Sequence, residues 1–251
     1  MTEPAFLLCT DLDRTLVPNG AQPESPRART RFASFAGHPS ITLAYVTGRH
    51  LALLEEAIAE YALPVPDFAL TDVGTKIYTR GVDWQVWSDW EQEIGTDWSG
   101  YGHASLGALF ADLPDLRLQE TEKQNTHKLS YYFPLQTDQD ALHAVMQERL
   151  TKRGVRASLV FSIDEPAAVG LLDVLPKRAT KLHAIEFLRE RLEVPLERTM
   201  FAGDSGNDLP VLASNIPSVL VANATGEVRE DAVARARNAG NGEFLYLAKG
   251  G

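Results

Sequence analysis

The sequence has almost no cysteine: Cys9 is the only one among 251 residues. A disulfide within the chain is therefore impossible, and a zinc site built on several cysteines is excluded. A single thiol suits a reducing compartment, and the N-terminal residues show no basic region followed by a long apolar stretch, as secretion signals do. We expect a cytoplasmic protein.

Long hydrophobic runs and clusters of basic residues are also lacking. No stretch of about 18 apolar residues occurs, so the sequence predicts no membrane-spanning helix. The formal net charge is −10, and no run of Lys and Arg could follow a phosphate backbone or an anionic lipid surface. We expect neither nucleic acid nor membrane as a partner, and a monomer is the default expectation. An anionic substrate would need a local positive site, built from a metal ion, helix N-termini or a few basic side chains.

The residues that are present indicate a soluble globular protein of one large or two modest domains, with 44% hydrophobic and 23% charged residues. Short apolar runs end abruptly in small or charged residues. These runs are 6–9, 41–46, 68–70, 200–202 and 219–222. Between them, apolar residues recur at helical spacing over 51–61 and 182–192. This alternation predicts a doubly wound α/β fold with a parallel sheet.

The pattern changes between about residues 81 and 171. Alternating or β-branched stretches occur at 116–120, 127–133 and 155–163, and 138–153 has a helical period. We therefore predict an α/β core formed by 1–80 and 172–251, with a separate α+β domain inserted at 81–171. All four tryptophans fall at the predicted start of the insert.

Polar residues follow the apolar runs at the points where parallel strands would end. Asp11 and Asp13 follow the first run, and the sequence GDSGND at 203–208 supplies Asp204 and Asp208. Because ligands bind at the carboxyl ends of the strands in open α/β sheets, these carboxylates are expected to converge. Converging carboxylates repel one another unless a hard cation lies among them, and a set of oxygen ligands alone suits Mg²⁺.

A complementary anion-binding set is expected at the same edge of the sheet. Thr47, Gly48 and Arg49 offer a hydroxyl, an accessible backbone amide and a positive charge at a predicted helix start. Lys181, early in another predicted helix, could supply a second positive charge. The sequence therefore predicts a metal-assisted site for a phosphorylated or otherwise anionic small molecule.

Four of these segments resemble the four motifs of the haloacid dehalogenase superfamily of phosphatases: DLDRT, VTGR, Lys181 and GDSGND. The insert between the second and third motifs resembles the cap domain of that superfamily. More narrowly, LTDVGTKIY at 70–78, QNTHKLSYYF at 124–133 and LLDVLPKRATK at 171–181 are similar to the sucrose-phosphate phosphatase family. The resemblance covers essentially the whole chain.

The resemblance implies a Mg²⁺-dependent phosphatase of a sugar phosphate, with sucrose 6-phosphate as the first candidate. Asp11 would be the nucleophile that forms an aspartyl-phosphate, and Asp13 the general acid and base. The Asp11 carboxylate, the Asp13 backbone carbonyl and Asp204 would hold the metal, with Asp208 in support. Phosphoryl oxygens would be held by Thr47, Gly48 and Lys181. The residues expected to contact the substrate are Arg49, Asn125, Lys128 and Asn207.

Alternatives stay open at this stage. The same chemistry could act on mannosylfructose phosphate, glucosylglycerol phosphate or a hexose phosphate. A phosphomutase or a non-catalytic sugar-phosphate-binding protein could share the motifs. The sequence also departs from the sucrose-phosphatase pattern. Arg14 stands where Asn is common, Leu182 stands where Gly is usual, and the tail at 238–251 is rich in glycine where a closing helix would be expected.

Overall fold

The computed structural model describes residues 6–18, 25–164 and 167–249; the very start of the chain, which we interpreted above as lacking a secretion signal, lies outside these residues. The chain forms two compact units, Met1–Trp87 with Thr180–Gly251, and Ser88–Ala179. The expected boundaries at 80/81 and 171/172 lie slightly earlier, because β5 still pairs with the sheet of the first unit and the whole of β9 belongs to the second. Among the described residues, no helix is both long and apolar enough to cross a bilayer.

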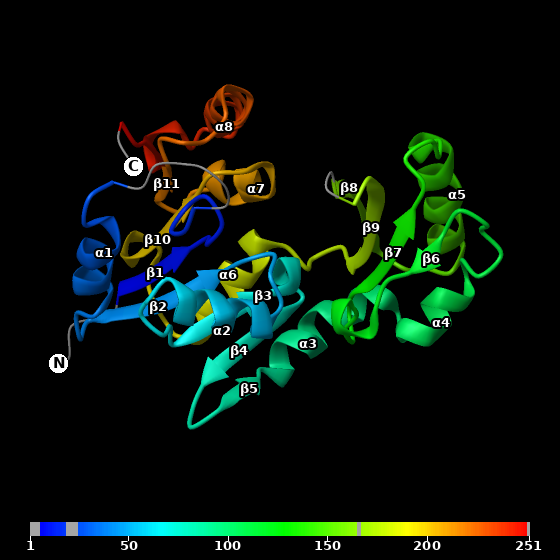
Figure 1. Ribbon diagram of the computed structural model, residues 1–251, viewed down its shortest axis with the longest axis horizontal. Helices are drawn as coiled ribbons and strands as arrows, with labels where there is room; N and C mark the ends of the chain where they lie inside the picture. The colour runs from blue at the N-terminus through cyan, green and yellow to red at the C-terminus, as the bar shows by residue number, and fades with distance from the viewer. Residues whose placement is uncertain (1–5, 19–24, 165–166, 250–251) are drawn as a thin grey trace. The chain divides into compact units, whose positions relative to one another are not determined.

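The first unit is built on an eight-stranded sheet with the order β12-β11-β10-β1-β2-β3-β4-β5 (Figure 1). The pairs from β12 to β3 are parallel, and β4 and β5 add an antiparallel edge. The strands are β1 (Phe6–Thr10), β2 (Ile41–Val46), β3 (Phe68–Thr71), β4 (Lys76–Arg80), β5 (Trp84–Val86), β10 (Thr199–Gly203), β11 (Ser218–Leu220) and β12 (Leu245–Leu247).

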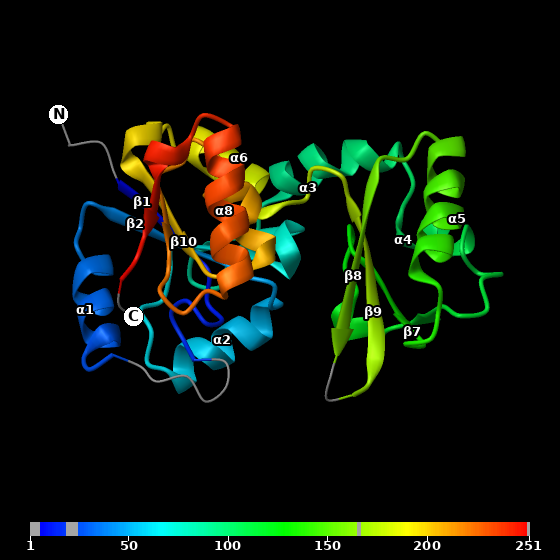
Figure 2. The same ribbon diagram turned by 90° about the horizontal axis from the view of Figure 1, so that it is seen from above.

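Helices cover both faces of this sheet, with α1 and α2 on one face and α6 and α8 on the other (Figure 2). The helices are α1 (Ala28–Ala36), α2 (Leu51–Glu60), α6 (Lys181–Arg191), α7 (Leu209–Leu212) and α8 (Gly226–Asn238). Burial on both faces explains why β1 and β2 are continuous apolar runs rather than alternating ones. The predicted doubly wound α/β fold is confirmed.

Strand order reverses at β1, which lies between β2 and β10. In one direction the chain continues from β1 through α1 to β2, while β10 arrives on the other side from the far end of the sequence. Such a switch in direction separates the loops at the carboxyl ends of the two central strands and opens a crevice for ligands. The residues that follow β1 and β10 are therefore the ones to examine.

The second unit is an antiparallel sheet, β6-β7-β9-β8, packed against helices. Its strands are β6 (Arg117–Leu118), β7 (Leu129–Phe133), β8 (Ala157–Asp164) and β9 (Val169–Pro176), and its helices are α3 (Ser88–Gly95), α4 (His103–Ala108) and α5 (Gln139–Lys152). Alternate residues of β7 enter the core, where they meet one apolar stripe of α5. This is the α+β arrangement that the alternating pattern predicted.

One expectation about local structure is wrong, and one departure from the family pattern is explained. The tryptophans are divided between the units: Trp84 lies in β5 of the first unit, where Trp87 also packs against Phe68 and Phe187. The glycine-rich tail contains the strand β12, which pairs in parallel with β11 and takes the place of a closing helix. In both cases pairing with an existing sheet edge decided the outcome, because an edge strand satisfies backbone groups that a loop would leave open.

Candidate active site

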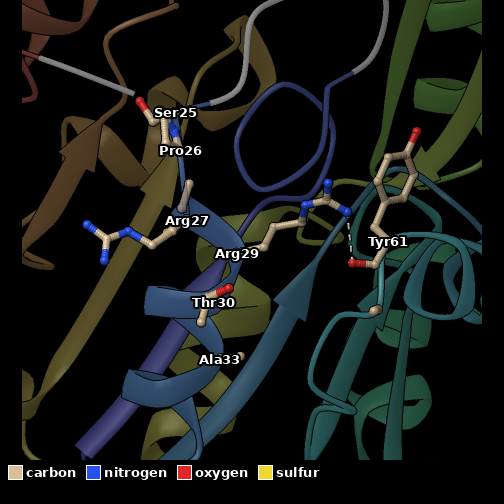
Figure 3. A pocket seen from close by; sticks show the side chains of 9 residues that line it. Ser25, Pro26, Arg27, Arg29, Thr30, Ala33 and Tyr61 are labelled. Atoms are coloured by element: carbon tan, nitrogen blue, oxygen red, sulfur yellow. Dashed lines mark hydrogen bonds between the residues drawn. The ribbon is translucent and has the colours of Figure 1, made fainter.

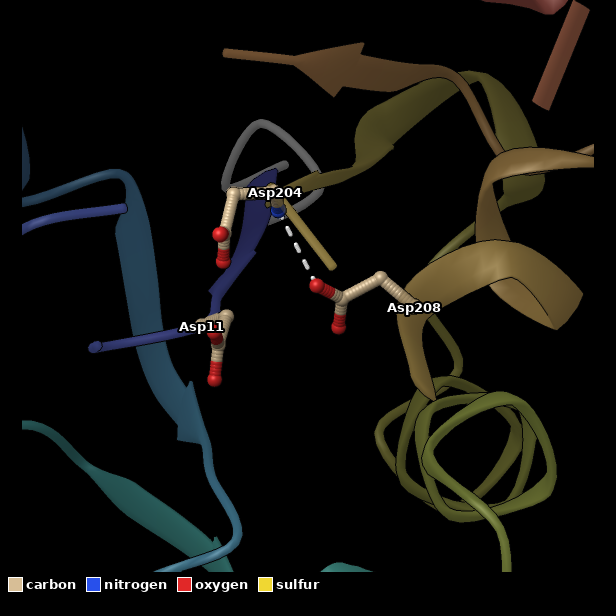
Figure 4. A group of neighbouring side chains, drawn as sticks. All are labelled: Asp11, Asp204 and Asp208. Atoms are coloured by element: carbon tan, nitrogen blue, oxygen red, sulfur yellow. Dashed lines mark hydrogen bonds between the residues drawn. The ribbon is translucent and has the colours of Figure 1, made fainter. Parts of the chain in front are cut away.

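Three carboxylates meet where β1 and β10 end (Figure 4). Asp11 follows β1, Asp204 follows β10, and Asp208 ends the short turn Gly206–Asp208. All three are buried, and each offers a carboxylate oxygen within 4.8 Å of the others. Adjacent parallel strands place Asp11 and Asp204 side by side, and the Asp11 amide donates a hydrogen bond to the Ala202 carbonyl at 2.9 Å.

Lys181 joins this cluster from the N-terminus of α6. Its Nζ donates to Asp11 Oδ1 at 2.9 Å and to Asp208 Oδ1 at 2.7 Å, and the residue is only 3% exposed. Burial alone would lower the pKa of Lys181, but the charges of Asp208 and Asp11 outweigh it and raise that pKa. Lys181 is therefore a fixed cation that partly neutralises the cluster.

Lys181 alone does not neutralise the three carboxylates, and the raised pKa values of two of them reflect this. Burial raises the pKa of Asp11 to about 7, although Lys181 opposes the shift. Burial, together with the charge of Asp208, raises the pKa of Asp204 as well. The site therefore favours an additional positive charge.

The oxygen atoms that remain without partners indicate where such a charge would lie. Asp208 is fully used, because Oδ1 binds Lys181 and Oδ2 accepts from the amides of Asp204 and Ser205 at 3.0 and 3.1 Å. Asp204 Oδ2 is different: it is buried and has no hydrogen-bond partner among the described residues. Oxygen ligands without nitrogen or sulfur donors suit Mg²⁺, so Asp11 and Asp204 fit direct ligation and Asp208 fits a supporting role.

The position of Asp208 depends on a glycine. A Cβ added to Gly203 would lie 2.6 Å from the Asp208 carboxyl carbon, closer than any real contact. Gly203 therefore leaves the space in which this carboxylate sits, while Ser205 Oγ adds a further contact to Asp208 Oδ2 at 3.1 Å. The GDSGND segment therefore supplies two of the carboxylates and also fixes the position of the Asp208 side chain.

Asp13 does not join the three-carboxylate cluster. Its side chain is bound at two points by Arg49, with Nη2 to Oδ1 at 2.6 Å and Nε to Oδ2 at 2.9 Å. The sequence analysis placed Asp13 and Arg49 at the site but did not predict that they pair. Two-point pairing between guanidinium and carboxylate is specific in direction, so Arg49 determines where the Asp13 carboxylate points.

Thr47 and Gly48 follow β2, the strand next to β1, and so lie at the same edge of the sheet as Asp11. Thr47 is buried, and its Oγ1 accepts a hydrogen bond from the Arg49 amide at 3.1 Å. A Cβ at Gly48 would meet nothing within 4 Å, so the space beside this residue is open. These positions are compatible with the predicted binding of phosphoryl oxygens.

The loop after β3 supports Lys181, a link that sequence reasoning missed. Gly74 has φ +90°, and a Cβ there would lie 2.8 Å from the Thr180 carbonyl carbon. Only glycine accommodates both this conformation and this approach. The TDVG segment therefore packs its backbone against the first turn of α6, next to Lys181.

The remaining predicted contacts are surface or second-unit residues. Asn207 is exposed, and its Oδ1 accepts from Ser205 Oγ at 2.8 Å. In the second unit, Asn125 Oδ1 accepts from the His127 amide at 2.9 Å, and Lys128 Nζ lies 4.0 Å from Asp173 Oδ1. Ser130, two residues after Lys128, is fully buried and donates to Asp173 Oδ1 at 2.5 Å.

A pocket of about 580 Å³ occurs in the first unit at the start of α1, lined in part by Arg27, Arg29 and Tyr61 (Figure 3). Arg29 donates to the Tyr61 carbonyl at 3.1 Å. None of the residues that we predicted for the active site lines it. The pocket is therefore separate from the carboxylate cluster.

The fold is that of the haloacid dehalogenase hydrolases. A haloacid dehalogenase-like hydrolase from Bacillus subtilis has the same fold at 19% identity, with a TM-score of 0.66 over 90% of this chain and 85% of that one. More narrowly, the chain belongs to the sucrose-6F-phosphate phosphohydrolase family, whose model matches residues 4–250. The resemblance found in the sequence is thereby confirmed at both levels.

Individual relatives agree with this family. The sucrose-phosphatase of Synechocystis sp. PCC6803, solved with sucrose and phosphate, is 26% identical with a TM-score of 0.74, covering 98% of this chain and 92% of that one. An HAD-like hydrolase of Nitrosococcus oceani is 55% identical over 98% of this chain. The mannosylfructose-phosphate phosphatase of Agrobacterium fabrum is 29% identical over 90% of this chain and 86% of its own length. The chain spans 66% of the Nitrosococcus protein and 54% of a tobacco sucrose-phosphatase.

Proposed function

We propose that this protein is a Mg²⁺-dependent phosphatase that hydrolyses a sugar phosphate, with sucrose 6-phosphate as the first candidate substrate. The observation that carries the proposal is the buried group of Asp11, Asp204 and Asp208 bridged by Lys181 at the switch point of the sheet. Membership in the sucrose-6F-phosphate phosphohydrolase family supports the same reaction.

In the first step, a carboxylate oxygen of Asp11 attacks phosphorus and forms an acyl-phosphate bond while the bond from phosphorus to the sugar oxygen breaks. Asp13 donates its proton to that departing oxygen. Arg49 engages both oxygens of Asp13, so one of the two contacts must give way to the sugar oxygen while the other keeps the carboxyl group oriented.

In the second step, water attacks the phosphorus of the aspartyl-phosphate and releases inorganic phosphate with the Asp11 carboxylate. Asp13, now unprotonated, accepts the proton of the attacking water. Thr47, the Gly48 amide and Lys181 hold the phosphoryl oxygens through both steps, which fixes the line of attack.

Mg²⁺, held by Asp11, Asp204 and the Asp13 backbone carbonyl, would neutralise charge on the phosphoryl oxygens. Lys181 forms ion pairs with both Asp11 and Asp208 and so holds the two carboxylates together. Asp208 is held by Lys181 and by two backbone amides, which suits a supporting role rather than direct ligation.

The identity of the sugar depends on residues outside this centre. Lys128 and Asn125 of the second unit, and Arg49 and Asn207 of the first, are our candidates for contacts with the substrate. A substitution such as Lys128→Met tests this. If Lys128 contacts the sugar, its loss raises KM for the preferred substrate several-fold and leaves kcat nearly unchanged.

Mannosylfructose phosphate is the second candidate substrate. It is favoured by the similarity to the mannosylfructose-phosphate phosphatase, of which the chain spans 86%. The chemistry at phosphorus would be unchanged, and only the sugar contacts would differ.

Release of inorganic phosphate from a panel of sugar phosphates, with Mg²⁺ or with EDTA, tests the proposal. The panel contains sucrose 6-phosphate, mannosylfructose phosphate, glucosylglycerol phosphate and hexose phosphates. We expect Mg²⁺-dependent release from one disaccharide phosphate and a loss of at least about 10³-fold for Asp11→Asn. Asp231→Asn, which removes an exposed carboxylate paired with Arg235, is the control and should be active.

Four results would contradict the proposal. Turnover unaffected by EDTA would contradict a role for the metal. Turnover unaffected by Asp11→Asn would contradict an aspartyl-phosphate intermediate. Binding of sugar phosphate by the folded protein without phosphate release would favour a binding protein, and return of the phosphoryl group to the sugar would favour a phosphomutase.

A further inference from the structure

Arg14 occupies an unusual backbone position in the loop after β1. Its φ is +61°, in the left-handed region that favours glycine or asparagine. The loop is tightly closed, because the Arg14 amide donates to the Val17 carbonyl at 2.7 Å and the Arg14 carbonyl accepts from Asn223 Nδ2. A long charged residue is thus tolerated here at a conformational cost, which a contact of its side chain would offset.

The Arg14 side chain reaches the carboxylate cluster. Its Nε lies 3.4 Å from Asp204 Oδ2. Both atoms are buried, yet neither has a hydrogen-bond partner among the described residues. The two groups therefore form an ion pair without an aligned hydrogen bond, which is a weak arrangement for two buried polar atoms.

The oxygen that Arg14 approaches is the one that suits a cation. The other Asp204 oxygen, Oδ1, accepts from Thr15 Oγ1 at 3.3 Å, so Oδ2 alone is left for a further ligand. Three carboxylates meet at this point, and within the described part of the chain Lys181 pairs with two of them, Asp11 and Asp208. Among the described residues, Arg14 is the one whose positive charge forms an ion pair with Asp204.

The Arg14 side chain can move away from Asp204 without disturbing the backbone of the loop. Its side chain is 35% exposed, and the two backbone hydrogen bonds of the loop do not involve it. Rotation about the side-chain bonds would carry the guanidinium into water while Asp204 stays in place. A weak, half-exposed pair on an anchored backbone is suited to exchange with another ligand.

We propose that Arg14 is the resident counter-ion of the cation site: its guanidinium pairs with Asp204 when no divalent cation is bound, and a divalent cation must displace it. This inference rests on the cation site of the proposed function. Arg14 keeps the empty cluster from repelling itself, and its competition weakens the binding of Mg²⁺. Its removal therefore tightens Mg²⁺ binding and makes the metal-free protein less stable.

Titration of the substrate-free protein with Mg²⁺ by calorimetry tests the competition directly, without any turnover. Arg14→Gln removes the charge while keeping a long side chain at the same φ, and we expect its Kd for Mg²⁺ to be about tenfold lower than that of the wild type. Arg14→Lys keeps a positive charge and should remain close to the wild type. Arg27→Gln is the matched control, because Arg27 also has a positive φ of 65° but is exposed at the start of α1; it should leave the Kd unchanged.

Thermal unfolding provides a second readout. In EDTA, Arg14→Gln should melt below the wild type, and saturating Mg²⁺ should raise its Tm by more than it raises that of the wild type. A merely structural role for Arg14 would lower the Tm equally with and without Mg²⁺ and would leave the Kd unchanged, and that result overturns the inference.

Failure of the inference and failure of the cation site give different results. If the wild type and Arg14→Gln bind Mg²⁺ with the same Kd, the site stands and the role of Arg14 is wrong. If neither binds Mg²⁺, the proposed cation site falls and the inference falls with it. If only Arg14→Gln binds Mg²⁺ measurably, the competition is stronger than expected and the inference holds.

Discussion

Both units bury aspartates, and two of them, Asp97 of the second unit and Asp204 of the first, have opposite surroundings. In the second unit, Asp97 is 0% exposed and is bound by Arg156 and Arg178 side chains, and by the Arg178 amide at 2.7 Å. In the first unit, Asp204 is 2% exposed and keeps one oxygen without a hydrogen bond.

The difference separates a structural charge from a charge prepared for a ligand. Burial of a carboxylate is costly unless its oxygens are paired, so a fully paired one stabilises its surroundings and has nothing left to offer. Asp97, which lies between α3 and α4, binds the chain just before β8 and just after β9. One oxygen of Asp204 has no hydrogen bond from a described residue, so a bound cation would stabilise this buried carboxylate. Four predictions test this contrast.

The largest effect is expected for Asp97→Ala. It removes one acceptor from each of two arginine side chains and the acceptor of the Arg178 amide, and we expect a loss of about 3 kcal/mol in the free energy of unfolding, with or without Mg²⁺. Denaturant unfolding measures it. The control is Asp112→Ala, since Asp112 also pairs with an arginine of the second unit but at the surface, and its loss should be much smaller. Equal losses for both would contradict the structural role of Asp97.

Gly203→Ala should cost about 1–3 kcal/mol, because the new methyl group overlaps the Asp208 carboxyl group. Phosphate release should fall with it as Asp208 moves away from Lys181. Gly206→Ala, in the same segment, has open space around its added methyl group and serves as the control. Wild-type stability and turnover for Gly203→Ala would mean that the position of Asp208 does not matter.

Arg49→Gln should lower kcat/KM about tenfold, because Asp13 loses the two-point contact that orients it. Arg49→Lys keeps the charge but not the fork, and should fall between the wild type and Arg49→Gln. Steady-state kinetics measure both, with Arg80→Gln as a control at a position whose side chain donates to the Val65 carbonyl, outside the site. Equal activity of the lysine variant and the wild type would show that charge, not orientation, is what Arg49 contributes.

The smallest change, and the sharpest contrast with Asp97, is expected for Asp204→Asn in EDTA. Removal of an incompletely paired buried charge should alter the free energy of unfolding by less than about 1 kcal/mol, and the stabilisation by Mg²⁺ should disappear. Unfolding in EDTA and in Mg²⁺ measures both. A loss in EDTA as large as that of Asp97→Ala would remove the distinction between the two aspartates.

Much of this site could be predicted from the sequence because strand ends are local signals. An apolar run that stops at Asp11 or before Asp204 marks both the strand and its carboxyl end, and parallel pairing then brings the two residues together. Pairing of side chains from different loops leaves no such mark. The Arg49 contact to Asp13 and the Arg14 approach to Asp204 depend on where separate loops cross, so the sequence analysis named these arginines without their partners.

The sequence by itself determined the doubly wound fold, the insertion of an α+β unit and the residues brought to the carboxyl edge, because hydrophobic periodicity and chain order control all three. Only the tertiary structure decided how the charges are shared. It paired Lys181 with Asp11 and Asp208, paired Arg49 with Asp13 and buried Ser130 beneath its neighbours. It also left one oxygen of Asp204 without a hydrogen bond from any described residue. The physical reason is that burial and hydrogen bonding depend on distances between segments far apart in the chain, which no local pattern encodes.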